Sequence, residues 1–261
     1  MESVEQTLPS FSIVILANGC ATHLLKRTLD SVLAQKGYSF EILLIDSLVD
    51  PIGDELEHYF PSIHRHYTTV SNNLFLRMNK GITLAEGDYI HFLQPGEFYN
   101  SELVFSTLAT EIIEKQRPDC IISAILLREF GVKKPKIHEP KITGMEEVPR
   151  HASLLPYFFR KELFNKVGRL SPHFIYQGNY DFLCRLSQKS GLTKSHLHRV
   201  VTDYELSKFS PKSAIEEAIE RLQVIYKHFG FGRAMIWWVA QNHIQFFKWW
   251  WRSVKEALGK S

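Results

Sequence analysis

Residues 78–97, MNKGITLAEGDYIHFLQPGE, decide how the chain is organised. The first half repeats apolar residues at helical spacing and stops at Gly87, and glycine takes the positive φ past a helix end at least cost. Tyr89–Leu93 is a short apolar run, typical of a buried parallel strand. A Pro-Gly pair ends that strand and leaves the carboxylate of Glu97 at its carboxyl end, the edge of an open α/β sheet where ligands bind.

The segments before this stretch predict the start of a parallel sheet. Phe11–Leu16 is apolar and β-branched and is expected to form a buried strand, and residues 24–33 carry an apolar helical stripe. Phe40–Ile45 predicts a second strand, followed directly by Asp46. Strand, helix and strand in this order form a right-handed βαβ unit with parallel strands. We therefore expect Asp46 to lie at the same sheet edge as Glu97.

Length and composition indicate a globular α/β protein. The 261 residues suit one domain, or one domain with an appendage, and 44% hydrophobic residues are ample for a core. A formal charge of +3 without a dense basic block before the C-terminus does not indicate nucleic-acid binding, but it is compatible with a phosphate-bearing small molecule. Three scattered cysteines, Cys20, Cys120 and Cys184, argue against a disulfide framework or a zinc site and suit a reducing compartment.

The N-terminus predicts neither a signal peptide nor a membrane span. Acids precede the first apolar run, Phe11–Leu16, which is short, and no apolar stretch reaches the roughly 18 residues that a spanning helix needs. We therefore expect a cytoplasmic protein.

The stretch from Met78 to Tyr99 resembles family 2 inverting glycosyltransferases with the GT-A fold. It is similar to a subgroup that reads roughly AMNKGI..A.GDYI.FLNSGD.FY and builds bacterial surface polysaccharides. Ser12–Ile15, Thr28–Gln35 and Glu41–Asp46 also match the opening of that family, SIVIPTYN….L..TLDSVLAQ….EIIVVDDGSTD. The resemblance implies a three-layer α/β/α sandwich with a mostly parallel central sheet and a C-terminal helical extension. It also implies a nucleoside-diphosphate sugar, UDP- or GDP-linked, as the donor.

The same resemblance implies where the nucleotide sugar binds. By position, Asp46 inherits the role of accepting the ring N–H of the base, and its alternative role is to cap the following turn. Arg77 is expected to approach the pyrophosphate, with an exposed, solvated arginine as the alternative. The residues that we assign to nucleotide-sugar binding are Leu16, Ala17, Asn18, Asp46, Arg77, Asn79, Gln94 and Gly96.

A divalent cation is implied at Glu97. This residue stands where the wider family has its metal-binding Asp, and Gln94 stands where the family has the first Asp of its motif. Mg²⁺ or Mn²⁺ takes oxygen ligands and shares them with substrate phosphates, so a single protein carboxylate suffices. The alternative is that Glu97 is an ordinary loop acid.

The position of the catalytic base is altered. The family has its base Asp immediately before a Tyr-Asp pair, and here Asn179 stands before Tyr180 and Asp181. An amide has no useful basicity near neutral pH. Asp181 is the nearest acid but faces another side of the predicted helix, and His151, on the acceptor side by resemblance, is a candidate substitute because neutral imidazole accepts protons near pH 7.

The expected organisation is a glycosyltransferase domain over residues 10–210 and C-terminal helices over residues 211–261. Residues 10–127 form the nucleotide-sugar-binding half and residues 128–210 the acceptor half, which includes a surface excursion at 131–149. All five tryptophans lie near the C-terminus, and the basic residues around them are Arg233, Lys248, Arg252 and Lys255. This pattern suits a membrane interface through residues 233–255. The alternative is packing on the catalytic domain or on a second subunit.

The sequence therefore predicts a glycosyltransferase that acts in cell-envelope polysaccharide or lipopolysaccharide synthesis, peripheral on the inner face of the cytoplasmic membrane. It moves a sugar to a glycan or lipid-linked acceptor. A catalytically degenerate homologue that serves as a binding or scaffold protein stays open as the alternative. A nucleotidyltransferase on a similar sheet would need a Gly-rich basic phosphate loop after the first strand, and residues 18–21, Asn-Gly-Cys-Ala, lack it.

Overall fold

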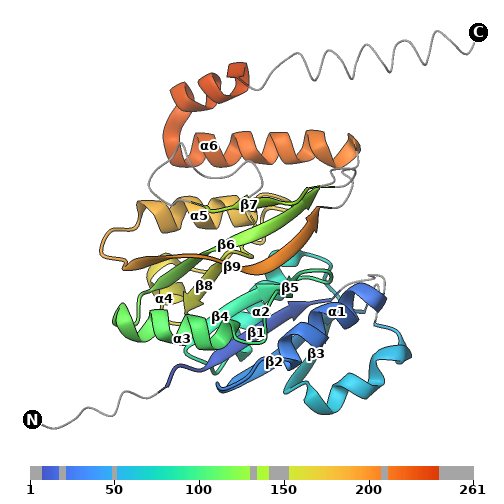
Figure 1. Cartoon of the computed structure of the whole chain (residues 1–261). Coiled ribbons are helices and arrows are strands. Elements are labelled where there is room, and N and C mark those ends of the chain that lie inside the picture. Colours follow the sequence, from blue (N-terminus) through green and yellow to red (C-terminus); the bar gives the residue numbers. More distant parts are fainter. Residues whose placement is uncertain are drawn as a thin grey trace, which may run out of the picture. The chain divides into compact units, whose positions relative to one another are not determined.

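The computed structural model describes residues 8–17, 22–48, 52–129, 134–140, 153–206 and 211–240. The chain divides into two compact units, residues 1–209 and residues 210–261. Figure 1 shows the helices and strands of both units.

One mixed sheet runs through the first unit, with its strands in the order β3-β2-β1-β4-β8-β6-β9-β5 and β7 paired with β6 (Figure 1). The strands are β1 (Phe11–Leu16), β2 (Phe40–Ser47), β3 (Arg65–Thr69), β4 (Tyr89–Leu93), β5 (Phe98–Tyr99), β6 (Cys120–Glu129), β7 (Lys136–His138), β8 (Tyr157–Arg160) and β9 (Lys194–Leu206). The helices are α1 (Thr22–Leu33), η1 (Asp54–Ser62), α2 (Leu74–Leu84), α3 (Val104–Glu114), α4 (Leu163–Val167), α5 (Gly178–Gln188) and α6 (Pro211–Ala240).

The parallel half of the sheet is centred on β1. β1 pairs in parallel with β2 on one side and with β4 on the other, and β3 extends the sheet in parallel beside β2. β8 is antiparallel to both β4 and β6, whereas β6 and β9 are parallel to each other. The predicted mixed α/β fold with a mostly parallel sheet is thus confirmed.

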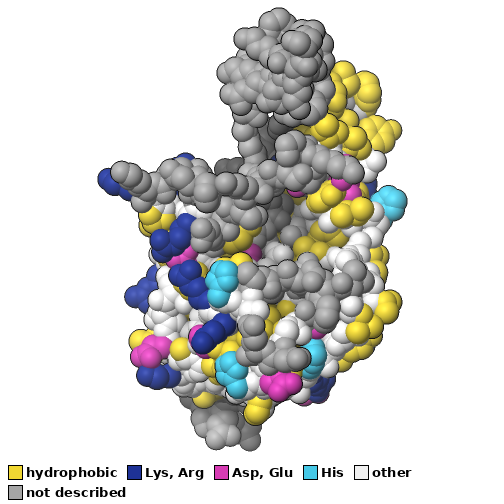
Figure 2. Space-filling view, turned by 90° about the vertical axis from the view of Figure 1, so that its right-hand side faces the viewer, with side chains coloured by type: hydrophobic (Ala, Val, Ile, Leu, Met, Phe, Trp, Pro, Cys, Tyr) yellow, Lys and Arg dark blue, Asp and Glu magenta, His cyan; other side chains and the backbone are white. Residues whose placement is uncertain are grey.

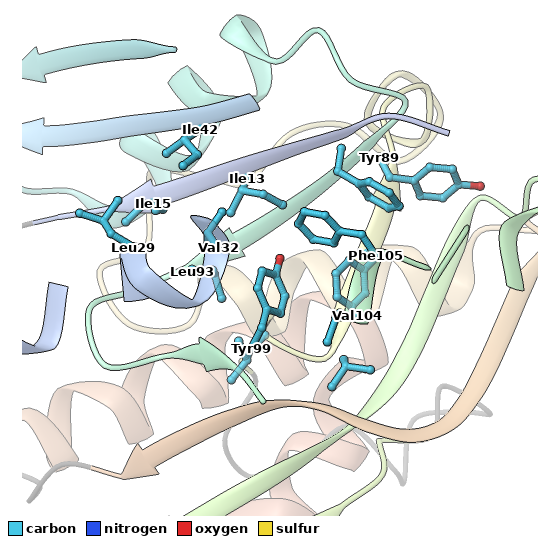
Figure 3. Packing of buried hydrophobic residues seen from close by; sticks show 14 of the residues in the cluster. Ile13, Ile15, Leu29, Val32, Ile42, Tyr89, Leu93, Tyr99, Val104 and Phe105 are labelled. Atoms are coloured by element: carbon cyan, nitrogen blue, oxygen red, sulfur yellow. The ribbon is translucent and has the colours of Figure 1, made fainter. Parts of the chain in front are cut away.

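Helices cover both faces of this sheet. On one face, apolar residues of α1 and α3 join alternate residues of the strands in one buried cluster (Figure 3). Within it, the rings of Phe11 and Phe105 stack with their centroids 4.7 Å apart. On the other face, the ring of Phe159 in β8 packs edge-on against Phe164 of α4 and Phe182 of α5. The side chains of successive strand residues point to opposite faces, so both helical layers meet an apolar surface.

Gly87 is required for a reason that differs from the predicted one. α2 ends at Leu84, its C-cap Ala85 has extended backbone angles, and Gly87 is not among the residues with positive φ. A Cβ atom at Gly87 would instead lie 2.7 Å from the carbonyl carbon of Phe11 and 2.8 Å from the nitrogen of Ser12. The expectation of positive φ was therefore wrong: glycine is needed because the backbone of β1 passes too close for a side chain.

One segment outside the predictions is a short helix, and one predicted segment differs from its predicted form. Residues 54–62 form a 3₁₀ helix. Residues 136–138 form β7 within the predicted surface excursion, because they pair with Ile125, Leu126 and Leu127 of β6. A three-residue strand carries too little periodicity to be recognised in the sequence.

The second unit contains α6. The helix is interrupted at Gly230, which has φ 78°, and helical structure then resumes to Ala240. Large apolar side chains after Gly230 are exposed, among them Phe231, Ile236 and Val239. Within the described residues, no helix has both the length and the apolar content that crossing a membrane takes.

His91 is a fully buried histidine in the middle of β4. Its Nδ1 lies 2.7 Å from the hydroxyl oxygen of Tyr99 and its Nε2 lies 2.8 Å from the carbonyl oxygen of Leu155. A carbonyl only accepts, so Nε2 carries the proton and Nδ1 accepts from Tyr99. Burial lowers the pKa of His91 from 6.5 to about 4, which keeps the ring neutral.

We expect the stability of the fold to fall in acid because of His91. His91 takes up a proton near pH 6.5 in the unfolded chain, but only near pH 4 in the folded protein. The contribution of neutral His91 to the free energy of unfolding is therefore complete above pH 6.5 and is lost as the pH falls toward 4. The loss should reach about 3 kcal/mol. Urea unfolding of wild type and His91→Gln at several pH values measures it. Parallel pH curves for the two proteins would contradict this assignment.

Candidate functional site at the carboxyl edge of the sheet

Asp46 and the loop that ends in Glu97 lie at the same edge of the sheet, on either side of β1. Leu16, the last residue of β1, is in register with Ile45 of β2, and Ile15 is in register with Leu93 of β4. Because all three strands run in the same direction, the residues that follow them meet at one edge. Figure 2 shows the right-hand side of Figure 1, the side toward which β6 and β9 run. On the described part of this face, basic, acidic and histidine side chains lie among hydrophobic ones.

Asp46 is buried at the end of β2 and is held by backbone N–H groups. Its Oδ1 accepts from the nitrogen of Ser47 at 2.7 Å and its Oδ2 accepts from the nitrogen of Ile52 at 3.3 Å. The predicted alternative role, capping the following turn, is therefore present in the structure. Each carboxylate oxygen keeps a second acceptor position, so turn capping does not use up the capacity of Asp46.

His66 is a neighbour of Asp46 that the sequence analysis did not single out. Its Nε2 lies 3.8 Å from Oδ2 of Asp46, and its ring stacks on Phe60. The strand register explains why His66 lies near Asp46. His66 pairs with Leu44, which lies two residues before Asp46 and points to the same face of the sheet. The period-2 pattern of β3 would have indicated this contact once its pairing with β2 was known.

Residues 94–97 form a tight turn that is fixed to α1. The nitrogen of Glu97 donates to the carbonyl of Gln94 at 2.9 Å, and Gly96 has φ 91°, as the third residue of a type II turn requires. The nitrogen of Gly96 also donates to the carbonyl oxygen of Leu24 at 3.2 Å and to the hydroxyl oxygen of Thr28 at 3.0 Å. The predicted strand end at the Pro-Gly pair is confirmed.

The carboxyl group of Glu97 points back into this turn. Its Oε2 accepts from the nitrogen of Gln94 at 2.7 Å, and the residue is 2% exposed. Burial raises the pKa of Glu97 to about 8, against the smaller lowering effect of the Gln94 N–H. A carboxyl group that is buried and bonded within its own turn does not face a substrate-bound cation, which shares its oxygen ligands with the substrate phosphates. The residues present therefore do not fit the implied metal site.

Arg77 and the end of β1 are buried together. Arg77 is 1% exposed, and its Nη1 donates to the carbonyl of Ala17 at 2.6 Å. The alternative of an exposed, solvated arginine was therefore wrong, because the side chain crosses from α2 to the end of β1. The side chains of Leu16 and Ala17 are also buried. Asn18, the third residue predicted here, lies outside the described residues.

Asn79, which was assigned to nucleotide-sugar binding, has hydrogen-bond partners within the fold. Its Nδ2 donates to the carbonyl of Leu170 at 2.8 Å and its Oδ1 accepts from the nitrogen of the same residue at 3.0 Å. Both ends of the amide are thus used to hold the segment that leads to α5. Asn73, the N-cap of α2, contributes to the same attachment by donating to the carbonyl oxygens of Pro172 and Phe174.

Asn179 lies in the first turn of α5, which packs against α2. A side chain at Gly178 would come within 2.6 Å of the ring of Phe75, so the two helices meet closely there. Asn179 is 9% exposed, and among the described residues no hydrogen-bond partner reaches its buried Oδ1. Such a group normally finds a partner, which makes Asn179 a candidate for contact with a ligand. His151 lies outside the described residues.

Asp181 is engaged within the fold. Its Oδ2 accepts from Nε of Arg185 at 3.0 Å, while Arg185 also donates to the carbonyl oxygens of Val167 and Arg169. The Asp181 side chain is buried. This carboxylate orients an arginine that joins α5 to the end of α4, so the structure supplies a structural partner for Asp181.

Comparisons with known proteins agree with this fold. Residues 12–175 match the family model described as glycosyl transferase family 2. No curated protein sequence matches the chain significantly. Among solved structures, S. aureus TarS 1–349 is similar with a TM-score of 0.61 and 14% identity, over 84% of this chain and 66% of that one. Its complexes with UDP and with UDP-GlcNAc both give a TM-score of 0.63 at 14% identity, over 84% of this chain and 66% and 67% of theirs.

This chain thus spans 66% of the length of the first of these TarS structures. At 14% identity the likeness concerns the fold, which is the GT-A fold that the sequence predicted. The family match covers more than half of the chain and includes both β2, which carries Asp46, and the turn at Glu97. The chain therefore belongs to glycosyl transferase family 2.

Proposed function

We propose that this protein binds a nucleoside-diphosphate sugar at the carboxyl edge of its sheet and transfers the sugar to a glycan or lipid-linked acceptor. The observation that carries this proposal is the placement of Asp46 and the Gln94–Glu97 turn on either side of the end of β1. Support comes from the family match and from the similar fold of TarS, which has been solved with UDP and with UDP-GlcNAc. A UDP-linked donor is accordingly the first to test, with GDP-linked sugars as the alternative.

In this proposal Asp46 recognises the base. The ring N–H of uracil or guanine donates to the carboxylate, which the N–H groups of Ser47 and Ile52 already hold in place. A hydrogen bond to a charged group contributes about 1.5–3 kcal/mol. Arg77 is proposed to favour the diphosphate through its positive charge, held beside Ala17 behind the edge.

Asp46→Asn should weaken UDP binding by about tenfold to a hundredfold, because the charged acceptor for the base is removed. Isothermal titration with UDP and GDP measures this change. A UDP derivative methylated at N3 of uracil lacks the donor, so its affinity should be the same for both proteins. Asp88→Asn, which changes a carboxylate next to the amino end of β4, is the matched control and should bind UDP like wild type. Equal UDP affinities of wild type and Asp46→Asn would leave Asp46 only its turn-capping role.

Asn179 favours a second candidate function. The amide can accept a hydrogen bond from an acceptor hydroxyl, but it cannot remove the proton. A homologue that binds the donor and transfers sugar slowly or not at all, acting as a binding or scaffold protein, is consistent with that residue. Turnover of a panel of UDP- and GDP-sugars separates the two functions.

We further propose that the protein acts in cell-envelope polysaccharide synthesis, peripheral on the inner face of the cytoplasmic membrane. Within the described part of α6, support comes from exposed apolar side chains after Gly230, including Trp238, together with exposed Arg233. Aromatic and basic side chains of this kind suit a lipid interface. The predicted contacts of residues 241–255 lie outside the described residues.

A further inference from the structure

The Glu97 side chain completes the turn in which it lies. Two hydrogen bonds join Gln94 and Glu97. The Glu97 nitrogen donates to the carbonyl oxygen of Gln94 at 2.9 Å, and the Gln94 nitrogen donates to Oε2 of Glu97 at 2.7 Å. The main-chain donor and acceptor of Gln94 are therefore both satisfied by one residue. If the side chain rotated outward, the half-buried Gln94 N–H would lose this hydrogen bond, which opposes the rotation.

The carboxyl group is directed toward the interior of the first unit. Glu97 is 2% exposed. Burial, with a smaller contribution from Glu97 once it is ionised, raises the pKa of Tyr204 in β9 to about 12. Tyr204 packs against the apolar cluster described above. A ligand for a cation that bridges to phosphates must instead face the substrate side of the edge.

The rest of the turn offers no substitute for Glu97. Gln94 has an uncharged amide, and residues 95 and 96 are Pro and Gly, which carry no ligating side chain. The turn is also fixed by the bonds from the Gly96 nitrogen to Leu24 and Thr28 of α1. A movement that turned Glu97 outward would have to overcome these attachments as well.

We infer that this protein binds its nucleotide without a divalent cation held by Glu97, and that Glu97 serves to close the turn after β4. This inference rests on the proposed nucleotide site, and it assigns Glu97 a structural role in place of the metal role implied by the family resemblance. The matching variant is Glu97→Gln, because glutamine keeps an oxygen acceptor for the Gln94 N–H and lacks the negative charge that a cation needs.

The test measures UDP affinity of wild type and Glu97→Gln by isothermal titration, in buffer with EDTA and in buffer with Mn²⁺. We expect each protein to bind UDP with the same affinity in both buffers, to within about twofold. A loss of roughly tenfold or more on chelation in wild type, absent in Glu97→Gln, would overturn the inference.

A second measurement keeps this inference separate from the proposed function. If UDP and GDP bind to neither protein, the nucleotide site fails, and binding of Mn²⁺ alone, followed by electron paramagnetic resonance, then decides the role of Glu97. Equal Mn²⁺ binding by wild type and Glu97→Gln supports the structural role, and weaker binding by the variant refutes it. Glu86→Gln makes the same change at an exposed glutamate and controls for the general loss of one negative charge.

Discussion

Replacing Asn179 by Asp should raise the rate of sugar transfer by about 10²- to 10⁴-fold, the usual contribution of a general base. The family resemblance predicts that Asn179 stands at the position of the base, and its buried Oδ1 has no partner among the described residues. An aspartate of the same shape would present a carboxylate at that point. Its low exposure would raise its pKa toward neutrality, which suits proton transfer near pH 7.

The measurement is release of UDP from a UDP-sugar, with water as the acceptor, followed over a range of pH. Asn179→Asp should gain a rate that rises with pH through one ionisation, and wild type should lack that dependence. Asn179→Leu, of similar size and without a base, is the matched control and should be no faster than wild type. If Asn179→Asp is as slow as Asn179→Leu, the base lies elsewhere, and His151 becomes the next residue to replace.

Asp181→Ala should lower the free energy of unfolding by about 3–5 kcal/mol, because it leaves Arg185 without its buried counter-charge. The Asp181 side chain is 1% exposed and that of Arg185 is 22% exposed, so solvent screens this pair little. The pair also orients the two Arg185 bonds to the carbonyl oxygens of Val167 and Arg169. Loss of the carboxylate should therefore loosen the join between α5 and the end of α4.

Urea unfolding of wild type, Asp181→Ala, Arg185→Met and the double variant measures the pair as a cycle. The double variant should be more stable than the sum of the single losses predicts, because neither charge is then left alone. A catalytic role for Asp181 gives the opposite pattern. Asp181→Asn would then keep wild-type stability while losing nearly all turnover.

The positions of the strands and of the edge could be predicted from the sequence. The bounds of β1 and β4 coincide with the predicted Phe11–Leu16 and Tyr89–Leu93, because short apolar runs between turn residues leave little choice of structure. A βαβ connection sets the strand direction. That direction alone places Asp46 and Glu97 at one edge.

The direction of each side chain at that edge depended on contacts between distant parts of the chain. Asn79 turns to Leu170, 91 residues away, and Arg77 turns to Ala17, 60 residues away. His66 approaches Asp46 only through the register of β3 with β2. None of these contacts affects the local pattern of apolar residues, so the partners could not be chosen from the sequence.

The sequence by itself determined the family, the parallel pairing of the first two strands and the placement of Asp46 and the Glu97 turn at one edge, because motif residues, apolar spacing and chain direction are local properties. Only the tertiary structure decided that Glu97 faces inward, that Gly87 is glycine because β1 passes beside it, and that Asp181 serves Arg185. The physical reason is that burial and hydrogen bonding depend on which segments pack together, and packing brings together residues that lie far apart in the chain.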